Sequence, residues 1–103
     1  MNFNEKVWKA LTMIPNGSVA TYGQIAKAVQ SPHGARAVGN ACNKNPNAPI
    51  VPCHRVISST GGIGGYGLGI SRKIRLLENE GVTVKNNKIV NFREVLVAQK
   101  ELR

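Results

Sequence analysis

The sequence predicts a single domain that is mainly α-helical with a small β component. Three observations lead to this prediction. Apolar residues recur at helical spacing near the N-terminus, and two short helical segments then follow each other across a tight turn. Near the C-terminus, two runs of β-branched residues, 82–84 and 89–90, flank a turn that contains two asparagines. A chain of 103 residues, 42% of them hydrophobic, is long enough for one domain with one small core.

The first predicted helix covers residues 4–13. Its apolar side chains recur at helical spacing, at Phe3, Val7, Leu11 and Ile14. The segment Pro15-Asn16-Gly17 then breaks the chain, and residues 18–20 are expected to form a strand stub. A second short helix follows, because Thr21 and Gln24 have the spacing of a capping box. Its inward-facing residues are expected to be Ile25, Ala26 and Val29.

The third predicted helix begins with Ser31 as N-cap and Pro32 at the first helical position, and it ends near Asn43. Together with the second helix it predicts a helix-turn-helix. One face is apolar, with Val38, Ala41 and Cys42, and the opposite face carries Arg36, Asn40 and Asn43. Small residues at positions 34, 35, 37 and 39 suit insertion into a nucleic-acid groove, and close helix–helix packing explains the same pattern.

The second half of the chain predicts two loops, two helices and a hairpin. Residues 45–51 form a proline-punctuated loop, and residues 58–69 form a glycine-rich loop. A helix capped by Ser71 is expected to run to Glu80 and to stop at Gly81, with Ile74, Leu76 and Leu77 facing the core. A hairpin turns at residues 85–88, and a last helix covers residues 92–100, with Val95 and Leu96 inward.

The charge and the cysteines limit the class of protein. Fourteen Lys and Arg against five acids give a net charge of +9, which indicates a polyanion partner or a basic solvated surface. All five acids are Glu, which excludes a catalytic aspartate and an EF-hand loop. Two cysteines are too few for a disulfide scaffold. We find neither a signal peptide nor a membrane-length apolar run, so we expect an intracellular protein with reduced thiols and no membrane partner.

The adjacent pair Cys53-His54 is the sharpest chemical feature of the sequence. A thiolate is a strong nucleophile, and a nearby imidazole or cation favours its formation. A buried structural cysteine is the alternative interpretation. Zinc bound by Cys42, Cys53, His33 and His54 is a further alternative, although their spacing matches no usual zinc pattern. The glycine-rich loop is not followed by the residues of a phosphate-binding motif.

Several segments, in the same order along the chain, resemble the O6-alkylguanine–DNA alkyltransferases, also called methylated-DNA–protein-cysteine methyltransferases. Pro52-Cys53-His54-Arg55-Val56 is similar to their active-site signature. The resemblance continues in four further segments: Gly17 to Ala26, Ala35 to Ala41, Asn45-Pro46, and Gly64-Gly65-Tyr66 with Lys73, Leu76-Leu77 and Glu80-Gly81. It covers residues 3–82, and this ordered set of motifs is highly specific.

The resemblance implies a winged helix-turn-helix in which residues 1–103 form the DNA-binding and catalytic domain, without the N-terminal domain that the family usually carries. The implied partner is double-stranded DNA that contains O6-alkylguanine. The protein would flip the damaged base out of the duplex and transfer the alkyl group irreversibly to Cys53. We expect a monomer that is consumed in one turnover and that needs neither a cofactor nor a metal.

The family roles imply a catalytic group of five residues. Cys53 is the nucleophile, His54 its base through a water molecule, and Glu80 orients His54. Asn45 is expected to brace the active-site loop against the recognition helix. Tyr22 is expected to help rotate the nucleotide and to donate a proton toward the departing guanine.

The resemblance also implies residues that hold the DNA. Arg36 would fill the gap left by the flipped base, and the recognition helix would enter the minor groove. The expected DNA-binding set is Tyr22, Ala35, Arg36, Gly39, Asn40 and Arg55. The base pocket would be lined by Val56, Tyr66 and Gly67, where the backbone N–H of Gly67 replaces a hydroxyl found in some members.

Two other functions remain open from the sequence. An alkyltransferase-like protein recognises the lesion without reacting and recruits other repair factors, but such relatives replace the nucleophile, commonly with tryptophan. A basic winged-helix regulator would read one DNA sequence and would carry Cys53 and His54 by coincidence.

Overall fold

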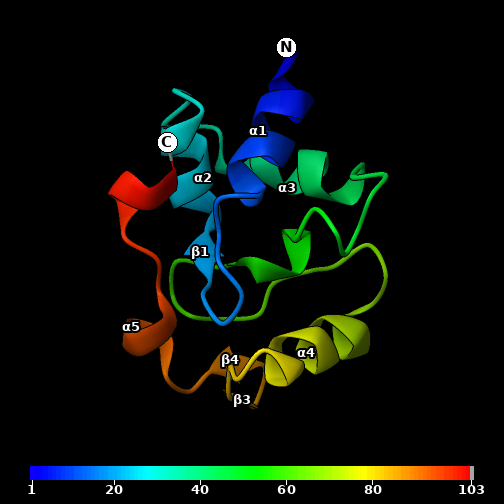
Figure 1. Ribbon diagram of the computed structural model, residues 1–103, viewed down its shortest axis with the longest axis vertical. Helices are drawn as coiled ribbons and strands as arrows, with labels where there is room; N and C mark the ends of the chain where they lie inside the picture. Colours follow the sequence, from blue (N-terminus) through cyan, green and yellow to red (C-terminus); the bar gives the residue numbers. More distant parts are fainter. Residues whose placement is uncertain (103) are drawn as a thin grey trace.

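The computed structural model describes residues 1–102, which form two groups of elements on either side of a short parallel strand pair (Figure 1). The first group consists of α1 (Phe3–Leu11), α2 (Tyr22–Ala28) and α3 (Ala35–Asn43). The strand pair is β1 (Ala20–Thr21) and β2 (Val56–Ile57), which follows a 3-10 turn, η1 (Cys53–Arg55). The second group consists of α4 (Ile70–Asn79), β3 (Val84–Lys85), β4 (Lys88–Ile89) and α5 (Phe92–Val95), and η2 (Gln99–Leu102) ends the described chain. The predicted mainly helical fold with a small β component is confirmed.

Capping boxes fix the starts of α1 and α2. The Thr21 hydroxyl accepts the Gln24 N–H at 3.0 Å, and the Gln24 side chain accepts the Thr21 N–H at 2.9 Å, as the sequence predicts. The same reciprocal pair forms between Asn2 and Glu5 at the start of α1, which the sequence analysis missed. Each box satisfies two N–H groups that a helix start otherwise leaves without a partner.

The start of α3 differs from the prediction. The helix begins at Ala35 with Gly34 as N-cap, so the expectation that Ser31 caps it and Pro32 opens it is wrong. The Ser31 N–H instead donates to the Ala26 carbonyl at 2.8 Å, which keeps Ser31 in the chain reversal that ends α2. The Gly34 N–H then closes a turn onto the Ser31 carbonyl at 2.8 Å. A side chain at Gly34 would meet the Ser31 hydroxyl at 2.6 Å, so this tight turn requires glycine.

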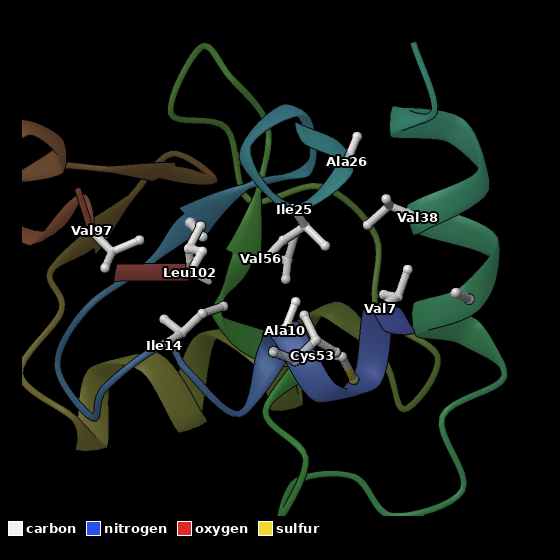
Figure 2. Close-up of a cluster of buried hydrophobic side chains, with 13 residues drawn as sticks. Val7, Ala10, Ile14, Ile25, Ala26, Val38, Cys53, Val56, Val97 and Leu102 are labelled. Carbon is white, nitrogen blue, oxygen red and sulfur yellow. The ribbon is translucent and has the colours of Figure 1, made fainter. Parts of the chain in front are cut away.

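The strand pair separates two hydrophobic clusters. Ala20 pairs with Val56 and Thr21 with Ile57, and successive side chains of a strand point to opposite faces. Val56 therefore packs into the cluster under α1, α2 and α3, which also contains Cys53 (Figure 2). Ile57 packs into the second cluster, under α4 and the hairpin, together with Val19, Ile63, Leu77, Val82 and Ile89.

The end of α4 and the hairpin form as predicted, whereas the start of α4 does not. Gly81 has a φ of +89°, and Val82 N–H donates to Leu77 O at 3.0 Å, which together make a Schellman stop. Asn86 and Asn87 have φ values of +54° and +60° and turn the β3–β4 hairpin. The N-cap of α4 is Gly69, without a side-chain hydrogen bond, so the predicted Ser71 cap is wrong.

The last predicted helix, residues 92–100, is also wrong beyond Val95. Val19 N–H donates to Val95 O and Val97 N–H donates to Val19 O, both at 2.8 Å, so the chain becomes extended beside Val19. Val97 is thereby buried in the first cluster. The two hydrogen bonds satisfy the backbone N–H and carbonyl of buried Val19. This gain outweighs the helical preference of the local sequence. Among residues 1–102, no helix has both the length and the apolar composition of a membrane span.

Candidate functional site

A pocket of about 450 Å³ opens between α2, α3 and the glycine-rich loop. Its volume lies within the usual range for ligand sites, about 300–1,000 Å³. The side chains and backbone that line it come from four parts of the chain: Tyr22, Ala35, Arg36, Gly39, Asn40, Cys42, Asn43, Cys53, Gly65, Tyr66 and Gly67. Cys53 is 5% exposed and lines this pocket, so the thiol borders an opening although its residue is packed in the core.

A second pocket of about 180 Å³ adjoins the first. The two share Cys42, Asn43, Cys53, Tyr66 and Gly67, and the smaller one extends toward the loop that begins at Asn45. Cys53 therefore lines both pockets.

Asn45 connects the end of α3 to the loop that leads to the thiol. Its backbone N–H donates to Cys42 O at 3.2 Å, and its Nδ2 donates to Val51 O at 2.8 Å. The same Val51 carbonyl accepts the Cys53 N–H at 2.9 Å. Asn45 therefore ties the end of α3 to the loop that leads to Cys53.

His54, Arg55 and Glu80 form one hydrogen-bonded network behind the pocket. Arg55 donates to both carboxylate oxygens of Glu80, from Nε at 2.9 Å and from its terminal nitrogen at 2.8 Å. His54 Nε2 lies 3.0 Å from Glu80 Oε2. Because Arg55 holds Glu80 in its ionised form, which only accepts, Nε2 of His54 must carry the proton. The buried Nδ1 atom is then an unprotonated acceptor, with no hydrogen-bond partner within residues 1–102.

The pKa shifts agree with this assignment. Burial raises the pKa of Glu80, but hydrogen bonds from Arg55 and His54 outweigh it and bring the pKa below its usual value. Burial lowers the pKa of His54, and the hydrogen bond and charge of Glu80 only partly oppose this. At neutral pH the pair is therefore a carboxylate and a neutral imidazole, which is the state required of a general base and its orienting group.

Two tyrosines line the same pocket as the thiol. Burial, with the nearby Cys42 and Cys53, raises the pKa of Tyr22 to about 12. Burial and Cys53 likewise raise the pKa of Tyr66 to about 12. Both phenols stay protonated at neutral pH, so each is able to donate a hydrogen bond or a proton into the pocket. The Tyr66 hydroxyl is buried beside the Cys53 thiol and forms no hydrogen bond of normal geometry within residues 1–102.

The predicted DNA-contacting residues of α3 all line the larger pocket: Ala35, Arg36, Gly39 and Asn40. Arg36 is exposed on this helix and forms no ion pair within residues 1–102. Cys42, Asn43 and Gly65 also line this pocket, although the sequence did not predict them as site residues. For Asn43, its helical spacing with Arg36 and Asn40 is the signal that indicates the shared face.

Two predicted site residues lie elsewhere. Arg55 was expected to bind DNA, but its guanidinium is held by Glu80 and by Ile14 O at 2.7 Å. Val56 was expected in the base pocket, but its side chain is fully buried in the first cluster. Its N–H donates to Cys53 O, and its carbonyl accepts from Lys73.

Metal ligands do not gather in the described structure. Within residues 1–102 no three His, Cys or Glu side chains are grouped closely enough to hold a metal ion. Cys42 is half-buried and Cys53 buried, and both are free thiols.

Comparison with known proteins gives consistent matches. The family model described as "6-O-methylguanine DNA methyltransferase, DNA binding domain" matches residues 2–82. The methylated-DNA–protein-cysteine methyltransferase of Mycobacterium leprae is 54% identical over 78 residues, which are 76% of this chain and 47% of that protein. The chain thus spans about half the length of the mycobacterial relatives it matches.

Two solved structures show the same fold. Mycobacterium tuberculosis OGT in complex with DNA aligns with a TM-score of 0.76 and 44% identity, covering 99% of this chain and 56% of that one. Schizosaccharomyces pombe Atl1, in complex with damaged DNA containing O6-carboxymethylguanine, aligns with a TM-score of 0.82 and 36% identity, covering 93% and 94%. On these matches, the chain belongs to the 6-O-methylguanine DNA methyltransferase family and contains its DNA-binding domain.

Proposed function

We propose that the protein repairs double-stranded DNA by transferring the alkyl group of O6-alkylguanine to its own Cys53. The observation that carries this proposal is the position of one thiol on a pocket beside α3, backed by a neutral histidine and its carboxylate. The relatives' names and the DNA in the related structures support the reaction class. We also propose that residues 1–103 act as one unit that binds DNA and reacts.

The target base must leave the duplex to reach the thiol. Cys53 is buried and lines the pocket, whereas Arg36 and Asn40 are exposed on α3. In a stacked base pair the alkyl group on O6 lies in the major groove, where a buried thiol that approaches from the minor groove does not reach it. The nucleotide therefore rotates into the pocket while Arg36 occupies the vacated space. The small residues Ala35 and Gly39 permit the DNA backbone to approach α3 closely.

The transfer is an in-line displacement at the alkyl carbon. His54 Nδ1 takes the thiol proton through a water molecule, since Nε2 already donates to Glu80. The sulfur attacks the carbon, the C–S bond forms as the C–O bond breaks, and the electron pair moves to the guanine ring. Tyr22 donates its proton to that ring, and His54 returns a proton to Tyr22 by way of solvent. The thioether is stable, so each chain reacts once.

A non-reacting lesion-recognition protein is the second candidate. Atl1 favours it, because that structure matches this chain over nearly its whole length and holds damaged DNA. The presence of Cys53 favours the reacting protein, since a protein that only recognises lesions needs no nucleophile at this position.

Intact-mass analysis tests the proposal directly. The chain is mixed with a duplex that contains one O6-methylguanine, and peptide mapping then locates the modification. We expect one methyl group per chain, on Cys53. Cys53→Ala is expected to abolish the gain and to keep DNA binding. Cys42→Ala is the matched control, because it removes the other thiol of the same pocket and is expected to leave the transfer intact.

The other functions give different outcomes in the same experiment. Tight binding of the damaged duplex without any mass gain would support the non-reacting candidate. Equal affinity for damaged and undamaged DNA, with a strong preference for one sequence, would support a regulator. A methyl group on Cys42 would overturn the assignment of the nucleophile.

A further inference from the structure

Lys73 is the most unusual residue in the fold, because its side chain is completely buried. Its exposed fraction is 0%, whereas lysine is almost never fully buried unless its charge is compensated. The reaction proposed above does not use Lys73. A buried ammonium group loses its hydration, so its place in this fold requires an explanation.

The three N–H donors of Lys73 match three backbone carbonyls. Nζ donates to Val56 O at 2.7 Å, Ile63 O at 2.6 Å and Gly65 O at 3.1 Å. An ammonium has three donors and no acceptor, so the group is fully satisfied. Burial lowers the pKa of Lys73 to about 8, and the nearby Cys42 and Cys53 oppose this, so the group is mainly charged at neutral pH.

The three carbonyls belong to two segments of the chain, the one that follows Cys53 and the glycine-rich loop. Val56 directly follows the turn that carries Cys53, and Gly65 directly precedes Tyr66 in the glycine-rich loop. The Lys73 ammonium also lies 5.9 Å from the centre of the Tyr22 ring, within the range of a cation–π contact. One side chain therefore contacts the thiol segment, the loop over it and the tyrosine of α2.

Residues 64–68 of the glycine-rich loop form few hydrogen bonds other than the one from Lys73. At its start, Ile63 N–H donates to Asn87 O of the hairpin at 2.9 Å. For residues 64–68, the described structure records one bond within the loop, Gly69 N–H to Tyr66 O at 3.0 Å, and one to the rest of the fold, Lys73 to Gly65 O. Glycines at 64, 65 and 67 leave this segment with wide conformational freedom unless it is held.

We propose that Lys73 is a positioning residue, which fastens the glycine-rich loop to the segment that carries Cys53 and so keeps Tyr66 and Gly67 over the thiol. This inference rests on the proposed function for its effect on transfer, but the effect on the loop is measurable without DNA. The recorded hydrogen bonds of Lys73 Nζ all go to backbone carbonyls and none to the Cys53 thiol, so Lys73 acts through the loop.

The test replaces Lys73 with methionine, which keeps the length of the side chain and removes the three donors. Backbone order parameters from ¹⁵N relaxation are measured for Gly64 to Gly67 in the protein without DNA. We expect values of about 0.85 in the unsubstituted chain and below about 0.6 in Lys73→Met. With saturating damaged DNA, the single-turnover transfer rate is expected to fall by roughly 10- to 100-fold, because a misplacement near 1 Å suffices for such a loss. The dissociation constant for DNA is expected to stay unchanged.

Arg75→Met is the matched control, since Arg75 lies on the same helix, is exposed and loses the same charge. It is expected to change neither the loop nor the rate. Lys73→Gln keeps two N–H donors without the charge and is expected to give intermediate values. Unchanged order parameters and an unchanged rate in Lys73→Met would overturn the proposal. Values already below about 0.6 in the unsubstituted chain would overturn it too, even where a variant does not fold. A chain that never becomes methylated but shows the loop effect would overturn only the proposed function.

Discussion

At the scale of single residues, Glu80 has two tasks, because its carboxylate accepts from both His54 and Arg55. Glu80→Gln keeps the shape but removes the charge, and its amide can donate to His54 Nε2. That exchange would move the imidazole proton to Nδ1 and block its use as a base. We expect the transfer rate, measured in single turnover, to fall by roughly 100-fold. We expect the free energy of unfolding to fall by about 1–3 kcal/mol, because Arg55 loses its partner.

Glu78→Gln serves as the control for that substitution. Glu78 lies two residues earlier on α4, is exposed, and loses the same charge. Its rate and stability are expected to match the unsubstituted chain. If Glu80→Gln reacts at the original rate, the proton path through His54 is incorrect.

The stability of the protein should also depend on pH through His54. Its pKa in the folded chain lies below the value of 6.5 for an unperturbed histidine, so the unfolded chain binds more protons as the pH falls. The free energy of unfolding is therefore expected to be highest above pH 6.5 and to decline as the pH falls through the lowered pKa. Glu80 adds a second decline only below its usual value of 4.5. Urea unfolding between pH 7 and pH 5 therefore measures the decline that is due to His54 alone.

His54→Gln is expected to remove the decline between pH 7 and pH 5, whereas His33→Gln is expected to retain it, because His33 is exposed. A decline of equal size in both variants would show that His54 does not cause it.

At the scale of elements, the glycine that ends α4 fixes where Glu80 is placed. Gly81 adopts a φ of +89°, which an L-residue reaches only at a penalty of about 1–2 kcal/mol. Gly81→Ala is therefore expected to lower the free energy of unfolding by about that amount. Gly23→Ala is the matched change of opposite sign, since Gly23 lies within α2 and alanine is the better helix former by about 1 kcal/mol. Urea unfolding of both variants checks the pair, and a loss of equal size in both would contradict it.

The elements that the sequence predicts well are those whose signals are local. The capping box at Thr21, the stop at Gly81 and the two asparagines of the hairpin each act within four residues, and all three form as expected. The last helix was predicted wrongly because of a distant partner: Val97 is held by Val19 across almost the whole chain, and the local pattern gives no signal for that pairing. The start of α3 was predicted wrongly for a local reason, because the Ser31 N–H donates to Ala26 five residues earlier and keeps Ser31 in the chain reversal after α2.

The site shows the same division between local and distant information. The resemblance to the family identified eight of the eleven residues that line the larger pocket, whereas the signature around Cys53 and the polar face of α3 account for four. The sequence order of Cys53, His54 and Arg55 does not indicate where each side chain points. The hydrogen bond from Arg55 to Glu80 was therefore not predicted. Lys73 was missed as a buried group because its residue type predicts exposure, and its three carbonyl partners belong to segments that only the fold brings together.

At the scale of the whole molecule, the net charge of +9 predicts that DNA binding weakens as salt rises, but it does not say which face binds. Substitutions of Arg36 and Arg93 distinguish the effect of net charge from the effect of position on the surface. Both are exposed, but Arg36 lines the pocket on α3, whereas Arg93 lies on α5 in the other group of elements (Figure 1). Replacing either one with alanine removes the same charge. If net charge alone set the affinity, the two variants would bind equally.

We expect Arg36→Ala to weaken binding to a duplex with O6-methylguanine by about 10-fold, or 1.4 kcal/mol, because the flipped state loses the side chain that fills the gap. We expect Arg93→Ala to bind as the unsubstituted chain does. Fluorescence anisotropy at about 50 mM and 200 mM salt measures both affinities and their salt dependence. Equal losses in the two variants would mean that the protein binds DNA through its overall charge and not through α3, because only a localised contact distinguishes two exposed arginines on opposite groups of elements.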